Sequence, residues 1–347
     1  MRTSVTLAYK GKKVEGAIEK NTTELMLKTY LDEIFGPAVN IALKPNLIAA
    51  FGLTNVTELR EDKVPIFVLG TAGMRVFKQD HPTAHENLHK WIESYIMNRA
   101  EYESPKYETI TGESEAAYGW VSANSSLGAF SSEYKTKAKD TVGYLEMGGQ
   151  SAQIAFQPFE NELTPDKLHD GDITTVKLGE EEFDLVVKTW DLGSNQGWRE
   201  YQSDVVATGA TETFVDPHSP HGRKWTYTDA PGSNPHKLRG EGAFDSQRFH
   251  EKVLKVLDRL SQPTPARGSR LLDENLVAAL KARRFVGGAN FWYSTREVFG
   301  RNIDLEGTPK TTVFSFEEYL AEVKSTTELA WPYLQLRLVS SFSRVRK

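Results

Sequence analysis

Cysteine is absent from the whole chain of 347 residues. A chain without cysteine forms no disulfide bonds, so nothing in its covalent structure requires an oxidising compartment. Three Asn-x-Ser/Thr sequons begin at Asn21, Asn55 and Asn124, but so short a pattern arises by chance and carries less weight than the missing cysteines. We therefore expect a cytoplasmic protein.

Long apolar runs and excess positive charge are absent as well. No stretch approaches the roughly 18 apolar residues of a membrane-spanning helix, and Met1–Lys20 lacks the apolar core of a signal peptide. A net charge of −5 gives no general attraction to nucleic acid or to anionic membranes. With 39% hydrophobic and 26% charged residues, the composition is that of a soluble globular protein.

The distribution of apolar residues predicts an α/β fold in which strands alternate with helices. Strands are expected at Val5–Tyr9, Pro65–Leu69, Tyr107–Ile110 and Phe183–Trp190. Helices are expected after Thr22 and Thr23, from Pro82, and around Phe249, because apolar residues there share one helical face. The segment Asp216–Gly242 is rich in Pro, Gly, His and Ser, and we expect it to be a long surface excursion.

The most informative stretch is Tyr144–Phe156, in which an acid, two glycines and a Ser/Gln pair lie between two apolar runs. Gly148 and Gly149 have no Cβ, so the backbone can turn sharply and direct its N–H groups at an anion. Glu146 ends the incoming strand, where it could meet a metal ion or its water. The alternative interpretation is an ordinary hairpin turn between two strands.

Two groups of polar side chains accompany this motif. Ser151 and Gln153 occupy alternate positions, so on a strand both side chains project to the same side. Upstream, Thr111–Trp120 places Glu113 and Glu115 within one turn of each other, next to small residues. The alternative for these two acids is a helix N-terminus, where carboxylates complement the macrodipole without any catalytic role.

A second glycine-containing turn occurs in Val68–Arg75. An apolar strand again runs into small residues, here with the hydroxyl of Thr71 and the cation of Arg75. Two such turns in one chain suggest two loops that face one ligand.

In order and wording these segments resemble the nucleoside triphosphate diphosphohydrolases, or apyrases, of the actin-like ATPase superfamily. Four of the family's five signature regions are recognisable, the second to the fifth, at Val68–Arg75, Thr111–Asn124, Glu146–Ile154 and Phe285–Tyr293. Weaker echoes lie at Asp191–Gly197, Asp216–Gly222 and Gly240–Phe244. The resemblance covers nearly the whole chain and implies a two-lobed actin-like (RNase H-like) α/β fold, with mixed sheets flanked by helices. It places the first lobe at residues 1–111 and the second at 112–347, with the nucleotide in the cleft between them.

The resemblance also implies metal-dependent hydrolysis of nucleoside tri- and diphosphates. Glu115 matches the family's invariant acid, the general base that takes a proton from the attacking water. Ser151 and Gln153 match the residues that orient this water. Glu113 occupies a variable position of the motif and is expected to be a bystander.

Phosphate, metal and base contacts follow from the same resemblance. Backbone and hydroxyl donors to the phosphates are implied at Thr71, Ala72, Gly73, Gly148 and Gly149. Glu146 stands where the family has an aspartate on the water shell of the divalent cation, Mg²⁺ or Ca²⁺. The aromatic run Phe291, Trp292 and Tyr293 is implied as a stacking surface for the base, although such runs more often belong to a core.

Departures from the family pattern keep other functions open. The family begins with a phosphate loop of the form Asp-x-Gly-Ser, whereas Met1–Lys10 resembles only the strand after it, so we expect a first lobe truncated at its N-terminus. Trp331–Phe342 resembles the beginning of a family helix. Glu146 is one methylene longer than aspartate, about 1.5 Å of extra reach. The alternative function is therefore a catalytically impaired nucleotide-binding pseudoenzyme, and an exopolyphosphatase-type enzyme ranks third. A missing upstream segment would make the secretory pathway the expected location.

Histidine spacing offers one more candidate metal site. His81, His85 and His89 recur every four residues, as on one face of a helix. Pro82 disfavours helical backbone at His81, and the other two flank an apolar stripe. We therefore expect surface or boundary histidines rather than metal ligands.

Overall fold

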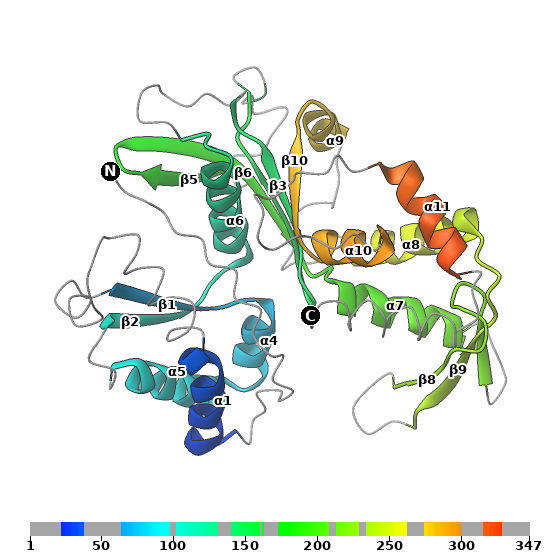
Figure 1. Cartoon of the computed structure of the whole chain (residues 1–347), viewed down its shortest axis with the longest axis horizontal. Coiled ribbons are helices and arrows are strands. Elements are labelled where there is room, and N and C mark those ends of the chain that lie inside the picture. The colour runs from blue at the N-terminus through cyan, green and yellow to red at the C-terminus, as the bar shows by residue number, and fades with distance from the viewer. Residues whose placement is uncertain are drawn as a thin grey trace. The chain divides into compact units, whose positions relative to one another are not determined.

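The structure is a computed structural model that describes residues 22–37, 64–97, 102–130, 140–159, 162, 173–207, 213–228, 234–261, 274–299 and 315–327. Its internal contacts divide the chain into two compact units, Met1–Thr111 and Gly112–Lys347. Figure 1 traces the elements of each. The predicted strand Val5–Tyr9 and the segment Trp331–Phe342 lie outside the described residues.

The first unit is built on two parallel strands, β1 (Val64–Gly70) and β2 (Tyr102–Thr109). Parallel strands need a crossover connection, and the chain between them forms α4 (Ala72–Asp80) and α5 (Pro82–Met97). α1 (Glu24–Pro37) packs against α5. Their shared core consists of buried side chains from α1, α5 and β2: Leu27, Leu31, Leu88, Ile92, Ile96 and Tyr107.

Local signals explain where these elements begin. The Oγ1 of Thr23 accepts a hydrogen bond from the N–H of Met26 at 3.3 Å, which caps α1. Pro82 is the first residue of α5, a position that needs no N–H donor. The predicted helices after Thr23 and from Pro82, and the strand Pro65–Leu69, are confirmed.

The second unit centres on a mixed five-stranded sheet in the order β10–β3–β4–β6–β5. Its strands are β3 (Gly143–Met147), β4 (Ala152–Phe156), β5 (Ile173–Leu178), β6 (Glu181–Trp190) and β10 (Phe285–Ala289). β10 runs parallel to β3, whereas the β3–β4, β4–β6 and β5–β6 pairs are antiparallel. The central strand β4 is buried along its whole length.

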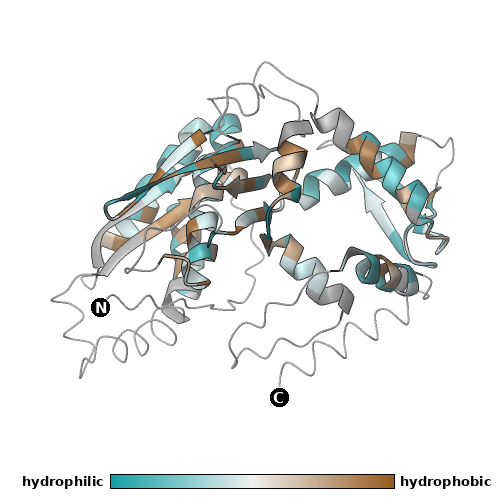
Figure 2. Cartoon of the chain, turned by 90° about the horizontal axis from the view of Figure 1, so that it is seen from above, coloured by the Kyte–Doolittle hydropathy of each residue, from teal (hydrophilic) through white to brown (hydrophobic). Residues whose placement is uncertain are grey.

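Helices cover both faces of this sheet, because its strands carry apolar residues on both sides. On one face, α6 (Gly112–Ser126) packs Ala116 and Trp120 against alternate residues of β6. On the other face, α9 (Glu274–Lys281) packs Leu276 against β4 and β6. Figure 1 shows the two helices on opposite sides of the strands, and Figure 2 shows hydrophobic and hydrophilic residues alternating along the helices.

The segment Asp216–Gly242 contributes two strands to a small sheet, so the predicted surface excursion is wrong. The sheet has the order β7–β9–β8, with β7 (Thr213–Asp216), β8 (Lys224–Tyr227) and β9 (His236–Gly240). The strands have only four or five residues, too few for their alternation to stand out among the turn-forming residues around them.

The small sheet has its own core. Tyr201 and Val205 of α7 (Ser194–Ala207) pack with Tyr227 and Leu238. Asp216 is 1% exposed and accepts hydrogen bonds from the hydroxyl groups of Tyr201 and Ser219, both at 2.6 Å. A buried carboxylate is stable only when its oxygens are hydrogen-bonded in this way.

Three helices complete the second unit. α8 (Ser246–Ser261) packs against α7, and α10 (Asn290–Phe299) follows β10 directly and packs against α11 (Phe316–Thr327). The predicted helix around Phe249 is confirmed as α8. None of the helices in the described ranges combines the length and apolar character needed to cross a bilayer.

Asn124 joins the end of α6 to the beginning of β3. Its side chain is fully buried. Its Nδ2 donates to the carbonyl groups of Trp120 and Val142, each at 3.0 Å, and its Oδ1 accepts the N–H of Val142 at 2.8 Å. In this fold the sequon at Asn124 is therefore inaccessible to glycosylation.

We expect Asn124→Ala to lower the free energy of unfolding by about 2 kcal/mol or more, because each buried group left unpaired costs about 1–3 kcal/mol. Urea unfolding followed by circular dichroism measures the change. Ser125→Ala, at an exposed position of the same helix, is the matched control. Equal stability of the two variants would contradict this structural role.

Candidate active site

The glycine motif forms the turn between β3 and β4, so its alternative interpretation as a hairpin turn is correct. The N–H of Gly148 donates to the carbonyl of Ser151 at 2.9 Å and closes the turn. Gly148 was expected to direct this N–H at an anion, but the hairpin uses it. The N–H groups of Gly149 and Gln150 have no hydrogen-bond partner among the described residues. These two N–H groups are therefore not used by the hairpin itself.

The first turn of α7 holds this hairpin turn in place. The N–H of Ser194 donates to the carbonyl of Gly148 at 2.9 Å, and the N–H of Asn195 donates to the carbonyl of Gly149 at 2.8 Å. The first N–H groups of a helix have no acceptors within the helix, and the turn supplies them. Asn290, the first residue of α10, adds a bond from its Nδ2 to the carbonyl of Gly148 at 3.0 Å.

Gly193 allows this close approach of α7 to the turn. A Cβ at this position would overlap the backbone of Gly149 and Gln150. Backbone atoms cannot swing away as a side chain can, so any larger residue would push the turn off the helix.

A hydrogen-bonded chain of three side chains lies beside the turn. The Nε2 of Gln153 donates to the Oγ of Ser151 at 2.6 Å and to the Oε2 of Glu115 at 3.3 Å. Gln153 is 2% exposed, and its Oε1 has no hydrogen-bond partner among the described residues. An unpaired buried oxygen costs about 1–3 kcal/mol, and a bound water molecule would satisfy it.

The start of α6 brings Glu115 to this chain. Gly112 lies so close to Thr189 of β6 that a Cβ there would overlap the threonine side chain. The first turn of α6 therefore lies directly on the sheet, and Glu115 faces Gln153 of β4. Glu113, two residues earlier, is exposed to solvent.

A second carboxylate, Glu146, lies at the end of β3. It is directly opposite Gln153 in the β3–β4 pair. Its Oε2 accepts a hydrogen bond from the hydroxyl of Tyr144 at 3.3 Å. Burial, and then the negative charge of Glu115, raise the pKa of Glu146 above its ordinary value. The two carboxylates are therefore close enough to repel each other, which a bound cation would relieve.

The oxygen donors near the turn fit a hard divalent cation that takes most of its ligands from a bound phosphate and from water. In the part of the chain that the structure describes, no group of three or more His, Asp or Glu side chains is arranged to hold a metal. Carboxylates are the ligands that Mg²⁺ and Ca²⁺ prefer, and Mg²⁺ commonly takes one or two carboxylates together with phosphate oxygens and water. Glu146, at the end of β3 beside the turn, is a carboxylate of this kind.

The other glycine-containing turn belongs to the first unit, between β1 and α4. Thr71 is the N-cap of α4, and its hydroxyl makes no capping hydrogen bond. The carbonyl of Thr71 accepts the N–H groups of Met74 and Arg75 at 2.8 and 3.0 Å. A helix N-terminus of this kind directs the N–H groups of its first residues, here Ala72 and Gly73, outward.

The chain matches a known protein family over most of its length. Residues 36–341 match the model of the GDA1/CD39 (nucleoside phosphatase) family. The chain belongs to this family.

Relatives of this GDA1/CD39 chain include two yeast proteins. It is 28% identical over 295 residues to a Golgi apyrase of Schizosaccharomyces pombe, a match that covers 80% of this chain and 46% of the relative. It is 26% identical over 274 residues to a Golgi apyrase of Saccharomyces cerevisiae, with 72% of this chain and 42% of the relative covered. The chain thus spans a little under half the length of these relatives.

A solved structure of nucleoside triphosphate hydrolases from Neospora caninum matches the fold. The match has a TM-score of 0.60 and 16% identity, and covers 88% of this chain and 64% of the other. The resemblance to apyrases and the actin-like α/β fold, both predicted from the sequence, are confirmed.

Within the second unit, the GDA1/CD39 fold brings Glu115, Glu146, Ser151 and Gln153 together at one end of the sheet, beside the Gly148–Gly149 turn. Thr71, Ala72 and Gly73 form their own turn in the first unit. The aromatic run at the start of α10 is not part of a core: Phe291, Trp292 and Tyr293 are 39%, 42% and 58% exposed.

Sequence reasoning missed the residues that support the turn. Gly193 and Ser194 lie in Asp191–Gly197, a segment with weak similarity to the family. Its place in the chain order was recognisable from the sequence, but its contact with the turn was not. Asn290 lies within the fifth signature, next to the aromatic run. Tyr144 lies on the strand before the glycines, where an aromatic residue indicates no particular role.

Two of the three regularly spaced histidines, His85 and His89, contact polar side chains of the first unit. His85 is 7% exposed, so it is buried rather than at the surface, and its Nε2 is 2.7 Å from the Oγ1 of Thr109. His89 pairs with Glu93 at 2.9 Å. Each side chain thus has a local partner in the first unit.

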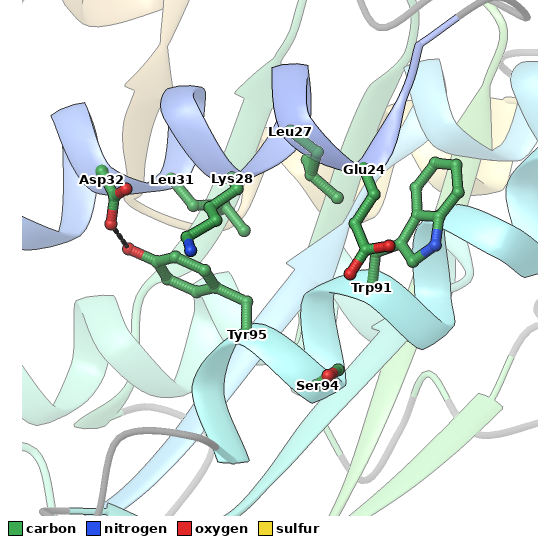
Figure 3. A pocket seen from close by; sticks show the side chains of 8 residues that line it. All are labelled: Glu24, Leu27, Lys28, Leu31, Asp32, Trp91, Ser94 and Tyr95. Carbon is green, nitrogen blue, oxygen red and sulfur yellow. Dashed lines mark hydrogen bonds between the residues drawn. The ribbon is translucent and has the colours of Figure 1, made fainter.

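A hollow of about 300 Å³ lies elsewhere in the first unit, between α1 and α5. Figure 3 shows its lining, in which the hydroxyl of Tyr95 donates to the Oδ1 of Asp32 at 2.6 Å. None of the motif residues lines it.

We expect Gly193→Ala to destabilise the second unit by about 1–3 kcal/mol, the usual cost of overpacking, because the new Cβ meets backbone of the turn. Gly197→Ala is the matched control in α7, the helix that follows Gly193, since a Cβ there meets nothing within 4 Å, and it should be neutral or stabilise by up to about 1 kcal/mol. Urea unfolding of both variants tests this. If the two are equally stable, the close approach of Gly193 to the turn is wrong.

Proposed function

We propose that the chain hydrolyses the terminal phosphoanhydride bond of nucleoside tri- or diphosphates. The observation that carries the proposal is the Glu115–Gln153–Ser151 chain, with its unpaired buried oxygen, beside a turn that presents free N–H groups. Membership of a nucleoside phosphatase family supports this chemistry. Other family members are named apyrase, nucleoside-diphosphatase or nucleoside-triphosphatase.

In the proposed reaction, Glu115 is the general base. Its carboxylate takes a proton from a water molecule, whose oxygen attacks the terminal phosphorus in line with the bridging oxygen. That bridge breaks, and the shortened nucleotide leaves with the electron pair. Ser151 and Gln153 orient the water, with the Oε1 of Gln153 as an acceptor for its other proton. Positioning of this kind dominates phosphoryl transfer, which needs little covalent help from the protein.

Phosphate-binding donors are proposed on each of the two glycine-containing turns. In the second unit the donor is the backbone N–H of Gly149, and Gly148, whose own N–H closes the hairpin, contributes the shape of the turn. In the first unit the donors are Thr71, Ala72 and Gly73. A bound Mg²⁺ or Ca²⁺ would neutralise phosphate oxygens, and Glu146 would hold its water shell.

The nucleobase is proposed to stack on the aromatic run of α10. Phe291, Trp292 and Tyr293 are exposed, and Asn290 directly before them bonds the phosphate turn at Gly148. Aromatic rings exposed next to a phosphate site offer a π-face to any base, which gives affinity without selecting one base.

A catalytically impaired nucleotide-binding protein is the second candidate function. Glu146 favours it, because its side chain is longer than the family's aspartate and a shift of about 1 Å can cost about 100-fold in rate. Turnover by the natural chain distinguishes the two functions.

The lobes, the partners and the cellular location are also proposed. Residues 1–111 and 112–347 are proposed as the family's first and second lobes. The proposed partners are the nucleotide substrate and its cation, with no nucleic acid or membrane partner. The Golgi names of two relatives favour the secretory pathway over the cytoplasm, and microscopy of a tagged chain would decide between these locations.

We expect Glu115→Gln to lower phosphate release by about 10²–10⁴-fold, the usual contribution of a general base, and to leave nucleotide binding intact. Phosphate release with Mg²⁺ and binding of a non-hydrolysable nucleotide are the two measurements. Glu113→Gln, an exposed carboxylate in the same helical turn, should retain the wild-type rate. If Glu115→Gln and the natural chain turn over equally fast, the catalytic assignment fails. If neither turns over but both bind nucleotide, the pseudoenzyme is the correct function.

We expect Gly73→Ala to weaken nucleotide binding by about tenfold, or about 1.4 kcal/mol, without lowering the melting temperature. A Cβ at Gly73 meets nothing within 4 Å, so the fold accepts it, but a phosphate held by the N–H groups of α4 would meet it. Gly197→Ala again serves as the control, with both binding and stability retained. Unchanged binding by Gly73→Ala would exclude the first turn from the phosphate site.

A further inference from the structure

Tyr144 lies on the same face of β3 as Glu146, two residues earlier, and that face packs against α6. Its hydroxyl donates to the Oε2 of Glu146 at 3.3 Å. In the described residues, no other hydrogen-bond partner of the Glu146 carboxylate is present. The orientation of this carboxylate therefore depends on one phenol.

Two glycines make room for the ring of Tyr144. A Cβ at Gly119 of α6 would overlap the ring edge. A Cβ at Gly288 of β10 would overlap the hydroxyl oxygen and lie 3.0 Å from the carbon that bears it. The ring is thus held from the helix side and from the neighbouring strand.

The strand register explains why the hydroxyl reaches Glu146. Gly288 is the residue of β10 directly opposite Glu146, and Val286 is opposite Tyr144. The tyrosine therefore leans diagonally across the sheet, which long side chains on neighbouring strands can do. Its hydroxyl occupies the place that a side chain at position 288 would fill, beside the carboxylate. Figure 1 shows β10 and β3 side by side.

A phenol has an ordinary pKa of about 10, so the hydroxyl of Tyr144 is a hydrogen-bond donor at neutral pH.

We propose that Tyr144 is a positioning residue that fixes the carboxylate of Glu146 toward the cation of the bound nucleotide, in a socket formed by Gly119 and Gly288. The role of the cation rests on the proposed function, whereas the socket does not. Outer-shell partners of this kind commonly change metal affinity by about 10–100-fold.

The first test measures metal-dependent binding by calorimetry. Mg²⁺ is titrated into the full chain in the presence of a non-hydrolysable nucleoside triphosphate, for the natural protein and Tyr144→Phe. We expect the variant to need about tenfold more Mg²⁺ for half-saturation, with unchanged nucleotide affinity at saturating Mg²⁺. Tyr95→Phe is the matched control, because it also removes a phenol hydroxyl that donates to a carboxylate, and its Mg²⁺ requirement should equal that of the natural chain.

The second test measures the socket without any metal. Gly288→Ala is made in the natural chain and in Tyr144→Phe, and melting temperatures are compared. We expect the alanine to lower the melting temperature more in the natural chain, since the phenylalanine lacks the oxygen that the new Cβ would overlap. Equal losses in both backgrounds would overturn the socket.

These outcomes separate this proposal from the proposed function. If the natural chain binds nucleotide in a Mg²⁺-dependent way and Tyr144→Phe needs no more Mg²⁺ than it does, only the positioning role of Tyr144 is overturned. If Glu115→Gln hydrolyses nucleotide at the natural rate, the catalytic role of Glu115 is overturned, and the result of the Mg²⁺ titration is unaffected. A natural chain whose nucleotide binding is independent of Mg²⁺ would overturn the positioning role together with the metal dependence.

Discussion

The side chain of Gln153 joins the three parts of the site in the second unit. Its amide N–H groups bond Ser151 at the end of the hairpin turn and Glu115 on α6. Because Gln153 lies on the central strand and is buried, the sheet itself fixes its position. The carboxylate proposed as the base is thereby held in a set orientation toward the turn. The free Oε1 of the same side chain leaves one buried acceptor for a water molecule. Every proposed catalytic role in the second unit depends on this amide.

The turn beside Gln153 is held in place by hydrogen bonds to the carbonyl groups of Gly148 and Gly149. Ser194 and Asn195 supply the first N–H groups of α7, and Asn290 supplies a side-chain amide from α10. Elements that follow the motif by more than forty residues thus determine its shape. Gly193 permits the approach of α7, and Gly149 leaves room for the side chain of Asn195, since a Cβ there would lie 2.8 Å from its Nδ2. The glycines serve packing as much as backbone flexibility.

The sequence predicted the elements whose signal is local. The helix after Thr23 and the helix from Pro82 follow from capping residues and apolar spacing, whereas the hairpin around Gly148 was only the alternative interpretation of its turn chemistry. The small sheet to which Asp216–Gly242 contributes could not be predicted, because its strands are short and the burial of Asp216 depends on Tyr201 in a distant helix. The family motifs identified Glu115 and Gln153 as candidates, but not Tyr144 or Gly288, because their contact arises only from the register of β3 with β10. The roles of the site residues stay predictions.

The most direct test of the account is a double-mutant cycle on Glu115 and Gln153. The turnover rates of Glu115→Gln, Gln153→Ala and the double variant are compared with that of the natural chain, with melting temperatures recorded to verify folding. Residues that act as one unit show losses that do not multiply. The account predicts a double variant about as slow as the slower single variant. Losses that multiply would show that the two side chains act independently, and would contradict the hydrogen-bonded chain as the basis of the site.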